Sequence, residues 1–405
     1  MKSIVILSSG SLATNPRLVK EANALHAHGF HVEVLYSYAV EWAEGIDKDI
    51  IQQSPWPAKL IGGSPSQNWF IYHWSRWLFR IIHRTRNPAF RTTRLTRTSR
   101  LLSRAAKAKK ADLYIAHNLG ALYAAVSAAN RHHALAAFDA EDYHSGEFAQ
   151  GSWDETLHQL VEKQYLPHCA QTWSASPLIS KAYQSRFPEL AFHKIDNVFP
   201  LKRQRPFRED TTQQVKFIWF SQTIGKGRGL EAIFDAFATQ SENSWALTLI
   251  GQVSDDMKID LVAFQTAYPN QVRLLDPISE EELFEELSQH DIGLALEIGI
   301  PENRNLCRTN KLFSYILSGC YVLMTDTQAQ LEFHSAYPES ATLLPLQASE
   351  NWAAITRDLI NRTEHLLHGR KANWKLGRSR LNWDIEQLKL RGIVEAMINS
   401  PAGKA

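Results

Sequence analysis

A short run in the second half of the chain combines a helix start with positive charge. Thr309 is a typical N-cap residue, Asn310 and Lys311 follow it, and Gly319 ends the run. Unpaired N–H groups and the positive end of the helix dipole favour an anion at such a start. The run therefore predicts a phosphate site, although a capped helix without a ligand would carry the same residues.

A glycine-rich loop supplies two more cations. Lys226 and Arg228 alternate with glycines in the segment 224–230, between an expected strand and an expected helix. The spacing is neither that of a Walker motif nor that of a Gly-x-Gly-x2-Gly fingerprint, which weakens an NAD-binding interpretation. Together with the helix start at Thr309, the loop favours a diphosphate as the ligand.

Polar residues also follow three apolar runs in the first half. Asn15 and Arg17 come shortly after the run 3–7, and His117 comes directly after the run 112–116. The residues that follow the run 134–138 include Asp139, Glu141, Asp142 and His144. Such residues could contact a sugar, act as an acceptor base or orient one. Helix capping by Asn15 and an ordinary hydrogen-bonded loop after residue 138 are the alternatives without a function.

Alternating strands and helices must position these residues. Asn15, Pro16 and Gly29 mark the start and end of a helix between strands expected at 3–7 and 31–36. In the second half, strands are expected at 215–220, 246–250, 272–275, 292–296 and 321–325. The pattern predicts an α/β fold with two doubly wound parallel sheets, in which ligands bind at the carboxyl ends of the strands.

The length of 405 residues favours two domains. We expect an N-terminal α/β domain over 1–197, an interdomain linker over 198–214 and a second α/β domain over 215–375. A C-terminal helix within 376–405 should return toward the first domain.

Composition and cysteine usage bear on location. The apolar run at the start is too short for a signal peptide, and no stretch approaches the roughly 20 apolar residues of a membrane span. Three widely spaced cysteines fit a reducing compartment and offer neither a disulfide framework nor a metal motif. We therefore expect a cytoplasmic protein.

The segment 67–110 is unusually basic and rich in tryptophan. No acidic residue occurs between Asp49 and Asp112, whereas nine arginines lie between Arg76 and Arg104. A basic helix with Trp and Phe side chains can lie on an anionic membrane surface, so residues 69–110 predict peripheral contact with a membrane. A solvated helix packed on its own domain is the alternative. No nucleic-acid-binding module accompanies the charge, and nucleic acid is not expected as a partner.

The order of the segments resembles that of the family-4 type of retaining glycosyltransferases, which have the GT-B fold. In the first half, 15–22 is similar to the first helix of the acceptor domain, 116–122 to the family's "His-Asp…Ala-Leu" loop and 139–142 to its "Asp-Ala-His-Glu" loop. In the second half, 226–231 is similar to the donor loop, 276–283 to the base-contacting loop and 310–319 to "Lys-Leu-Phe-Glu-Tyr-x3-Gly".

The chain departs from this family at important positions. The family's Glu-x7-Glu pair would fall on Leu306 and Ser314, and neither residue is a carboxylate. Glu297 and Glu302 follow the expected strand 292–296 and could supply the missing carboxylate, or they could be solvated loop residues. Glu141 replaces the histidine of "Asp-Ala-His-Glu", and His144 is close enough in sequence to occupy similar space.

The resemblance implies two Rossmann-like domains facing a cleft and transfer of a sugar, with retention, from a nucleoside-diphosphate sugar to a glycan or lipid-linked acceptor in surface-polysaccharide assembly. The implied donor-binding residues are Lys226, Arg228, Ile278, Glu302, Thr309, Asn310, Lys311 and Ser314. The implied acceptor-side residues are Asn15, Arg17, Asp139 and Asp142, and the catalytic candidates are His117, Glu141 and His144.

No metal or other cofactor is expected, because the cations and the helix start could neutralise the departing diphosphate. Two alternatives remain for the function. One is a noncatalytic nucleotide-sugar-binding or scaffold protein that has lost the glutamate pair, and the other is a sugar-nucleotide epimerase of the same fold.

Overall fold

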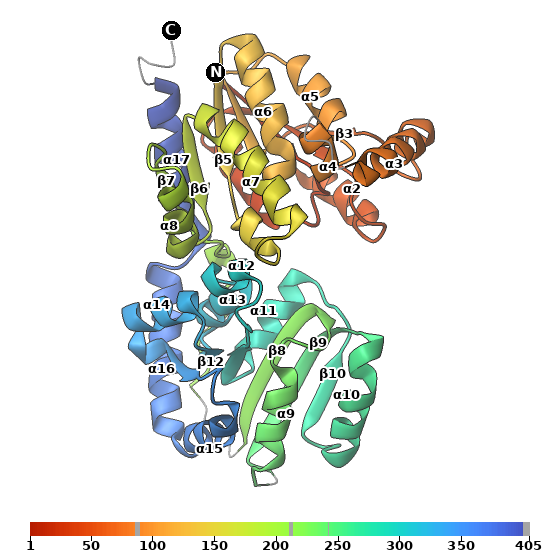
Figure 1. Ribbon diagram of the computed structural model, residues 1–405. Coiled ribbons are helices and arrows are strands. Elements are labelled where there is room, and N and C mark those ends of the chain that lie inside the picture. Colours follow the sequence, from red (N-terminus) through yellow and green to blue (C-terminus); the bar gives the residue numbers. More distant parts are fainter. Residues whose placement is uncertain (86–89, 210–213, 242, 400–405) are drawn as a thin grey trace. The chain divides into compact units, whose positions relative to one another are not determined.

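The computed structural model describes residues 1–85, 90–209, 214–241 and 243–399 (Figure 1). The chain divides into two compact units. The first contains Met1–Ile195, Pro301–Asn303 and the described residues from Gln387 on, and the second contains Asp196–Ile300 and Arg304–Glu386. Each unit is an α/β structure built on one sheet.

The first unit has a seven-stranded parallel sheet in the order β3-β2-β1-β4-β5-β6-β7. Its strands are β1 (Ser3–Ser8), β2 (His31–Ser37), β3 (Ala58–Ile61), β4 (Leu113–His117), β5 (Leu135–Asp139), β6 (Gln171–Ser174) and β7 (Phe192–Lys194). Every residue of β4 is buried, as expected for a parallel strand covered on both faces.

Helices cover both faces of this sheet. They are α1 (Pro16–Ala27), α2 (Ala43–Gln53), α3 (Trp69–Arg84), α4 (Arg91–Leu95), α5 (Ser99–Lys107), α6 (Leu119–His132), α7 (Trp153–Tyr165), α8 (Pro177–Arg186) and the last part of α17 (Trp383–Asn399). In Figure 1, α6 and α7 lie in front of the sheet, whereas α3 projects away from it. Right-handed crossovers place α1 on the face opposite α6, because these two helices lead to opposite edges of the sheet.

The second unit has a six-stranded parallel sheet in the order β10-β9-β8-β11-β12-β13. The strands are β8 (Val215–Ile224), β9 (Trp245–Val253), β10 (Val272–Leu275), β11 (Ile292–Ala295), β12 (Tyr321–Thr325) and β13 (Ala341–Leu344). The helices are α9 (Leu230–Ala238), α10 (Asp255–Ala267), α11 (Glu280–Ser288), α12 (Glu302–Leu306), α13 (Asn310–Ser318), α14 (Gln328–Ala336), α15 (Trp352–Asn361) and α16 (Thr363–Ser379). Both sheets follow the Rossmann strand order, and the first has one strand more.

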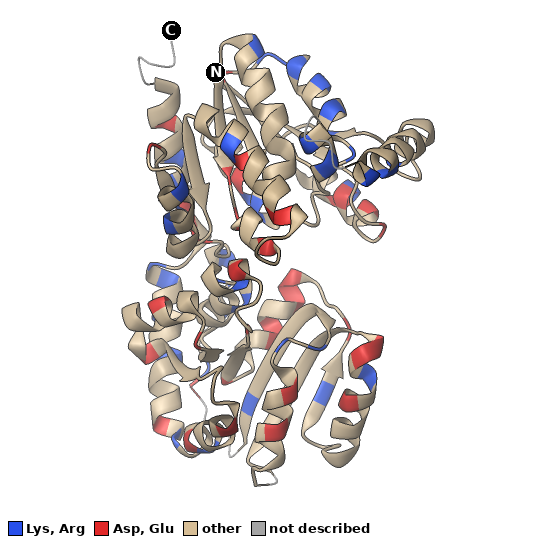
Figure 2. Cartoon of the chain, viewed as in Figure 1, with Lys and Arg blue, Asp and Glu red and all other residues tan. Residues whose placement is uncertain are grey.

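The described part of the basic segment contains the helices α3 to α5, whose lysines and arginines are blue in Figure 2. Only part of this charge is exposed. Arg94 is buried, donates to the Thr85 carbonyl and lies over the ring of Trp153. Arg97 donates to the carbonyls of Gly62 and Gly63 at 2.7 and 2.9 Å. These two arginines therefore hold neighbouring loops together, whereas Arg76, Arg80, Arg84, Arg100 and Arg104 are exposed.

Among the described residues, no helix combines the length and the apolar character that crossing a membrane requires.

Candidate functional site

The carboxyl ends of three neighbouring strands meet at one edge of the first sheet. Ser8 of β1 pairs with His117 of β4, which pairs in turn with Asp139 of β5. Because α1 and α6 leave β1 and β4 in opposite directions, the sheet has its topological switch point here, where Rossmann-like sheets bind ligands. The polar residues expected after these three strands are therefore brought together.

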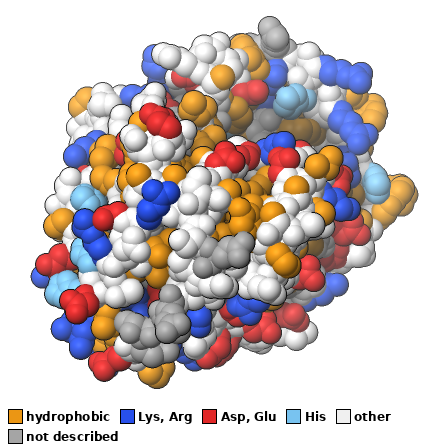
Figure 3. All heavy atoms as spheres, turned by 90° about the horizontal axis from the view of Figure 1, so that it is seen from below, with side chains coloured by type: hydrophobic (Ala, Val, Ile, Leu, Met, Phe, Trp, Pro, Cys, Tyr) orange, Lys and Arg blue, Asp and Glu red, His pale blue; other side chains and the backbone are white. Residues whose placement is uncertain are grey.

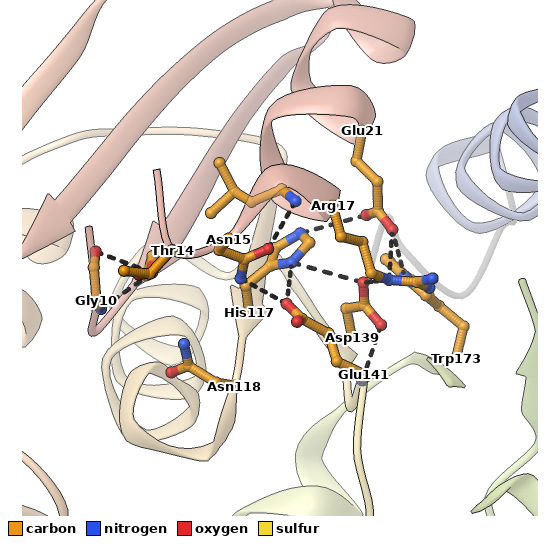
Figure 4. Close-up of polar contacts among 12 residues, drawn as sticks. Gly10, Thr14, Asn15, Arg17, Glu21, His117, Asn118, Asp139, Glu141 and Trp173 are labelled. Carbon is orange, nitrogen blue, oxygen red and sulfur yellow. Dashed lines mark hydrogen bonds and ion pairs between the residues drawn. The ribbon is translucent and has the colours of Figure 1, made fainter. Parts of the chain in front are cut away.

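A cluster of charged side chains occupies this edge (Figure 4). Its members are Asn15, Arg17, Glu21, His117, Asp139 and Glu141. Asn15 lies at the start of α1, where its Oδ1 accepts from the Leu18 N–H at 2.9 Å. Its Nδ2 donates to Glu141 Oε1 at 2.5 Å. Helix capping and a site contact are thus both present at Asn15.

Arg17 lies at the centre of the cluster. Its Nε is 2.5 Å from Asp139 Oδ2 and 3.4 Å from Glu21 Oε1, and its Nη1 donates to the Ile195 carbonyl at 2.8 Å. Burial opposes the charged form, but Asp139 and Glu21 raise the pKa of Arg17 above its ordinary value. The guanidinium is therefore a permanent positive charge inside the first unit.

His117 is also buried and surrounded by carboxylates. Its Nε2 is 3.3 Å from Glu21 Oε2, and its Nδ1 is 3.0 Å from Glu141 Oε1. Burial alone would lower the pKa of His117, but Glu21 and Glu141 raise it to about 10. The ring is thus an imidazolium at neutral pH, and its Nδ1 donates to Glu141.

The two buried carboxyl groups differ in acidity. Burial and the neighbouring Asp139 raise the pKa of Glu21 to about 7, although His117 and Arg17 oppose this. Burial would likewise raise the pKa of Asp139, but Arg17 and His117 hold it below its ordinary value. Asp139 is therefore ionised at neutral pH, whereas Glu21 takes up or releases its proton near pH 7.

Glu141 is the member of the cluster that reaches solvent, with 21% of its side chain exposed. Its backbone has a φ of 54°, and Asn118 at the start of α6 has a φ of 59°. Both values lie in a region that residues other than glycine rarely adopt, and such strain is often stored at functional sites. The fold thus holds the Glu141 carboxylate at the surface of the cluster, supported from within by His117 and Asn15.

Three residues of the cluster lie close enough to one another to share a metal ion, namely Glu21, His117 and Asp139. A guanidinium already lies against both carboxylates, however, and an imidazolium has no lone pair to offer. The donor set therefore suits an internal charge network better than a metal centre.

Three of the expected site residues are almost fully buried. Arg17, His117 and Asp139 each have at most 1% of their surface exposed. Asp139 Oδ1 accepts from the Glu141 N–H at 3.1 Å, and His117 Nδ1 lies 3.0 Å from Glu141 Oε1. These contacts fit the orienting role among the expected ones, and the roles of the three residues toward an acceptor or a sugar stay predictions.

His144 and Asp142 belong to a neighbouring network. His144 Nδ1 is 2.8 Å from Glu147 Oε1, and the His144 N–H donates to the Tyr183 hydroxyl at 3.1 Å. Burial opposes the charged form, but Glu147 raises the pKa of His144 to about 9. Asp142 Oδ1 accepts from Asn303 Nδ2 at 3.0 Å. Among the described residues, no hydrogen bond or ion pair joins His144 to the cluster, so it does not replace the family histidine there.

Glu21 was missed as a site residue. It lies four residues after Arg17 on α1, so the two side chains share one face of the helix. That face also carries the buried Leu18, Ala22 and Leu25. Two opposite charges one turn apart on an otherwise apolar helix face could have indicated that Glu21 belongs to a buried charged site.

In the second unit, the glycine-rich loop follows β8 at the corresponding switch point between β8 and β11. Gly229 has a φ of 77°, and a Cβ there would lie 2.9 Å from Cβ of Leu296, just after β11. Arg228 Nη1 donates to Ser221 Oγ at 3.2 Å. The Lys226 ammonium pairs instead with Asp260 at 2.8 Å on the surface. Arg228 is therefore the better candidate of the two for an anion.

The start of α13 brings Lys311 to Glu297. Lys311 Nζ is 3.2 Å from Glu297 Oε1 and 5.6 Å from the centre of the Trp219 ring. Thr309 is the N-cap residue, but its side chain makes no capping hydrogen bond, and its hydroxyl is buried without a partner in the described part of the chain. Asn310 is exposed. The carboxylate that the sequence placed after the strand is thus next to the expected phosphate site.

Three further donor-side expectations have different outcomes. Ser314 is buried and donates to the Asn310 carbonyl at 2.9 Å, and its role in donor binding stays a prediction. Glu302 starts α12 and is exposed, but it groups with the first unit. Ile278 is half-buried in the loop before α11, and its role stays a prediction.

Alkaline pH should weaken the first unit through His117. A group whose pKa is raised by folding stabilises the folded state below its unfolded pKa, and this stability is lost as the pH rises toward the folded value. For His117 the loss should extend from about pH 6.5 to about pH 10, at roughly 1.4 kcal/mol per pH unit. Urea unfolding between pH 8 and 9.5 should show this slope in the parent protein and a shallower one in His117→Gln. Equal slopes would contradict the buried imidazolium.

Comparison with known proteins defines the fold. No protein-family profile matches the chain, and no curated protein does. Among solved structures, the chain is similar to sucrose-phosphate synthase (tll1590) from Thermosynechococcus elongatus, with a TM-score of 0.72 and 13% identity over 98% of this chain and 99% of that one. It is also similar to Anabaena Alr3699/HepE in complex with UDP and glucose, with a TM-score of 0.71 and 14% identity over 98% and 100%.

A third similar structure is a provisionally assigned UDP-N-acetylglucosamine 2-epimerase from Listeria monocytogenes, with a TM-score of 0.61 and 10% identity over 98% of this chain and 97% of that one. At such identities the likeness concerns the fold. Because both parallel sheets follow the Rossmann order and the likeness extends over nearly the whole chain, the protein has the GT-B fold.

Proposed function

We propose that the protein is a glycosyltransferase that moves a sugar from a nucleoside-diphosphate sugar to a glycan or lipid-linked acceptor. The observation that carries this proposal is the likeness to HepE, which was solved with UDP and glucose, over 98% of this chain and 100% of that one. Shared fold alone does not determine a reaction, so the proposal also depends on the side chains at the two switch points.

The second unit has the groups that a donor diphosphate needs. Arg228 in the glycine-rich loop and Lys311 at the start of α13 are cations near the carboxyl ends of β8 and β11. Together with the N–H groups at the start of α13, they would stabilise the negative charge that develops on the leaving diphosphate. Glu297, beside Lys311, is the carboxylate that we propose in place of the family's glutamate pair.

The first unit has a carboxylate suited to the acceptor. Glu141 is partly exposed and is held by Asn15 and by the His117 imidazolium. We propose that it orients the acceptor hydroxyl by accepting its hydrogen bond. Transfer with retention at the anomeric carbon is part of the proposal and follows from the resemblance of the sequence motifs.

The cellular setting is proposed from composition and exposed surface. Within the described ranges, Cys169, Cys307 and Cys320 form no disulfide. They fit a cytoplasmic protein, and α3 fits peripheral contact with the membrane. We propose a role in surface-polysaccharide synthesis, where a cytoplasmic donor meets a membrane-associated acceptor.

A sugar-nucleotide epimerase is the second candidate, because the Listeria protein shares the fold at a TM-score of 0.61. A noncatalytic nucleotide-sugar-binding protein is the third, because Leu306 and Ser314 replace the glutamate pair of the resembling family. Product analysis separates these candidates: a transferase needs an acceptor, an epimerase converts the donor alone, and a binding protein does neither.

A thermal-shift screen with uridine, guanosine and adenosine diphosphate sugars tests donor binding. A ligand that binds only the folded state raises the melting temperature by mass action, and at about 100 times its Kd it contributes roughly 2.7 kcal/mol. We expect one nucleotide base to stabilise the protein more than the other two. The preferred donor is then incubated with extracted glycolipids, and the products are identified by mass spectrometry. No stabilisation by any of the nucleotide sugars would contradict all three candidate functions.

A further inference from the structure

A cavity in the first unit opens beside the loop that follows β1. It has a volume of about 600 Å³, and its lining includes Ser9, Tyr38, Tyr72, Arg76, Arg80 and Arg97. Ser9 donates to Asn118 Oδ1 at 2.6 Å, and Asn118 directly follows His117. The cavity therefore borders the same edge of the sheet as the charged cluster.

The three arginines of this cavity lack carboxylate partners. Arg97 is half-buried and donates to backbone carbonyls and to Ser75 Oγ at 2.8 Å, whereas Arg76 Nη1 donates to the Tyr72 hydroxyl at 2.6 Å. In the described part of the chain, none of the three forms an ion pair with an acidic side chain. Glu41 also lines the cavity and supplies one negative charge against three positive ones.

Burial and a neighbouring arginine make the charged form of Arg97 less favourable. Burial lowers the pKa of Arg97 below its ordinary value, and the neighbouring Arg76 lowers it further. An anion bound in the cavity would offset both effects, because its negative charge would take the place of the missing carboxylate partners. The phenol rings of Tyr38 and Tyr72, packed edge to face at 5.5 Å between centres, give the cavity a rigid wall.

Among the described residues, the helix that supplies Arg76 and Arg80 exposes an apolar face. Trp69, Phe70, Trp74 and Trp77 of α3 are between 54% and 82% exposed. Hydrophobic side chains gather at the right-hand edge of Figure 3, on the side where α3 lies in Figure 1. No acidic residue occurs on α3, so its charges are all positive. Large exposed aromatic side chains beside arginines are typical of a helix that enters the headgroup region of a membrane.

We propose that the cavity binds the phosphate group of a lipid-linked acceptor while the apolar face of α3 lies in the lipid layer. The arginines would then hold the phosphate at the level of the headgroups, and the part of the acceptor to be glycosylated would extend toward the edge of the sheet that carries Glu141. The inference deepens the proposed function, on which it rests for the role of the lipid as an acceptor.

Vesicle binding of the full-length chain tests the cavity. The vesicles are made of phosphatidylcholine with an equal small fraction of either a long-chain polyprenyl diphosphate or phosphatidylglycerol, and bound protein is measured by co-sedimentation. We expect Arg76→Gln/Arg80→Gln to weaken binding to the polyprenyl diphosphate vesicles by about tenfold or more, since each arginine contributes to the attraction. Trp74→Ala/Trp77→Ala should weaken binding to both kinds of vesicle.

A matched control separates the cavity from general positive charge. Arg104 and Arg131 are exposed and line a different cavity of about 410 Å³ in the same unit. Arg104→Gln/Arg131→Gln removes the same charge and should leave binding within twofold of the parent. Equal losses in the two double variants, or no loss in Arg76→Gln/Arg80→Gln, would overturn the proposal.

The source of the phosphate is decided in the same experiment. If Arg76→Gln/Arg80→Gln loses as much affinity for phosphatidylglycerol as for polyprenyl diphosphate, the cavity recognises an ordinary headgroup, and the assignment to an acceptor is wrong. Nucleotide-sugar binding by this variant should equal that of the parent in the thermal-shift assay. If the parent protein binds no nucleotide sugar either, the proposed function is refuted. The vesicle experiment would still decide whether the cavity binds phosphate.

Discussion

Replacing Arg17 by Leu should lower the free energy of unfolding by about 3–5 kcal/mol, because the substitution leaves buried carboxylates without their counterion. Asp139 lies 2.5 Å from the guanidinium, and Glu21 lies 3.4 Å from it. Both carboxylates are fully buried, so water cannot replace the lost charge. Chemical denaturation at neutral pH measures the loss. The raised pKa of Glu21 should rise further, so the variant should be less impaired at pH 5 than at pH 8.

A double-mutant cycle shows whether this loss comes from the pair of charges. Asp139→Asn alone leaves Arg17 with less countercharge, whereas Arg17→Leu/Asp139→Asn removes one charge of each sign. The double variant should be more stable than the sum of the two single losses predicts, by about 1–3 kcal/mol. Arg131→Leu on the exposed surface of α6 is the control and should change stability by less than about 0.5 kcal/mol. Additive losses within the cycle would rule out direct coupling.

Local signals predicted the elements of the fold well. The Asn15 cap and Gly319, which has a φ of 75°, occur at the helix ends where the sequence placed them. Such signals succeed because the hydrogen bonds of a cap join residues only three or four positions apart. The carboxyl ends of β1, β4 and β5 could also be expected to meet, because parallel strands share one direction.

Long-range pairing and depth of burial could not be predicted in the same way. Arg17 and Asp139 are 122 positions apart, and their spacing does not indicate that the guanidinium is enclosed. Likewise, the nine arginines of the basic segment look equivalent in sequence, yet Arg94 and Arg97 anchor loops while Arg76 and Arg80 remain exposed beside a cavity.

Arg228 in the glycine-rich loop contributes little to the stability of the folded protein. Arg228 is half-buried, and its Nη1 donates a 3.2 Å hydrogen bond to Ser221 Oγ. At a partly exposed position, water can replace this bond to a hydroxyl, so the folded protein depends little on Arg228. Its charge is therefore available for a ligand, in contrast to that of Lys226, which pairs with Asp260.

Arg228→Ala should consequently reduce kcat/KM for the preferred nucleotide sugar by at least about tenfold while leaving the melting temperature nearly unchanged. The lost charge-assisted hydrogen bond to a diphosphate is worth roughly 1.5–3 kcal/mol, and each 1.36 kcal/mol corresponds to a factor of ten in rate. Arg228→Lys should recover only part of the activity, because an ammonium cannot form the two parallel bonds of a guanidinium. Lys258→Ala, on the exposed surface of α10, is the control for a lost charge in the same unit. If Arg228→Ala keeps at least half of the parent activity, the diphosphate does not depend on this arginine, and Lys311 at the start of α13 becomes the cation that must hold it.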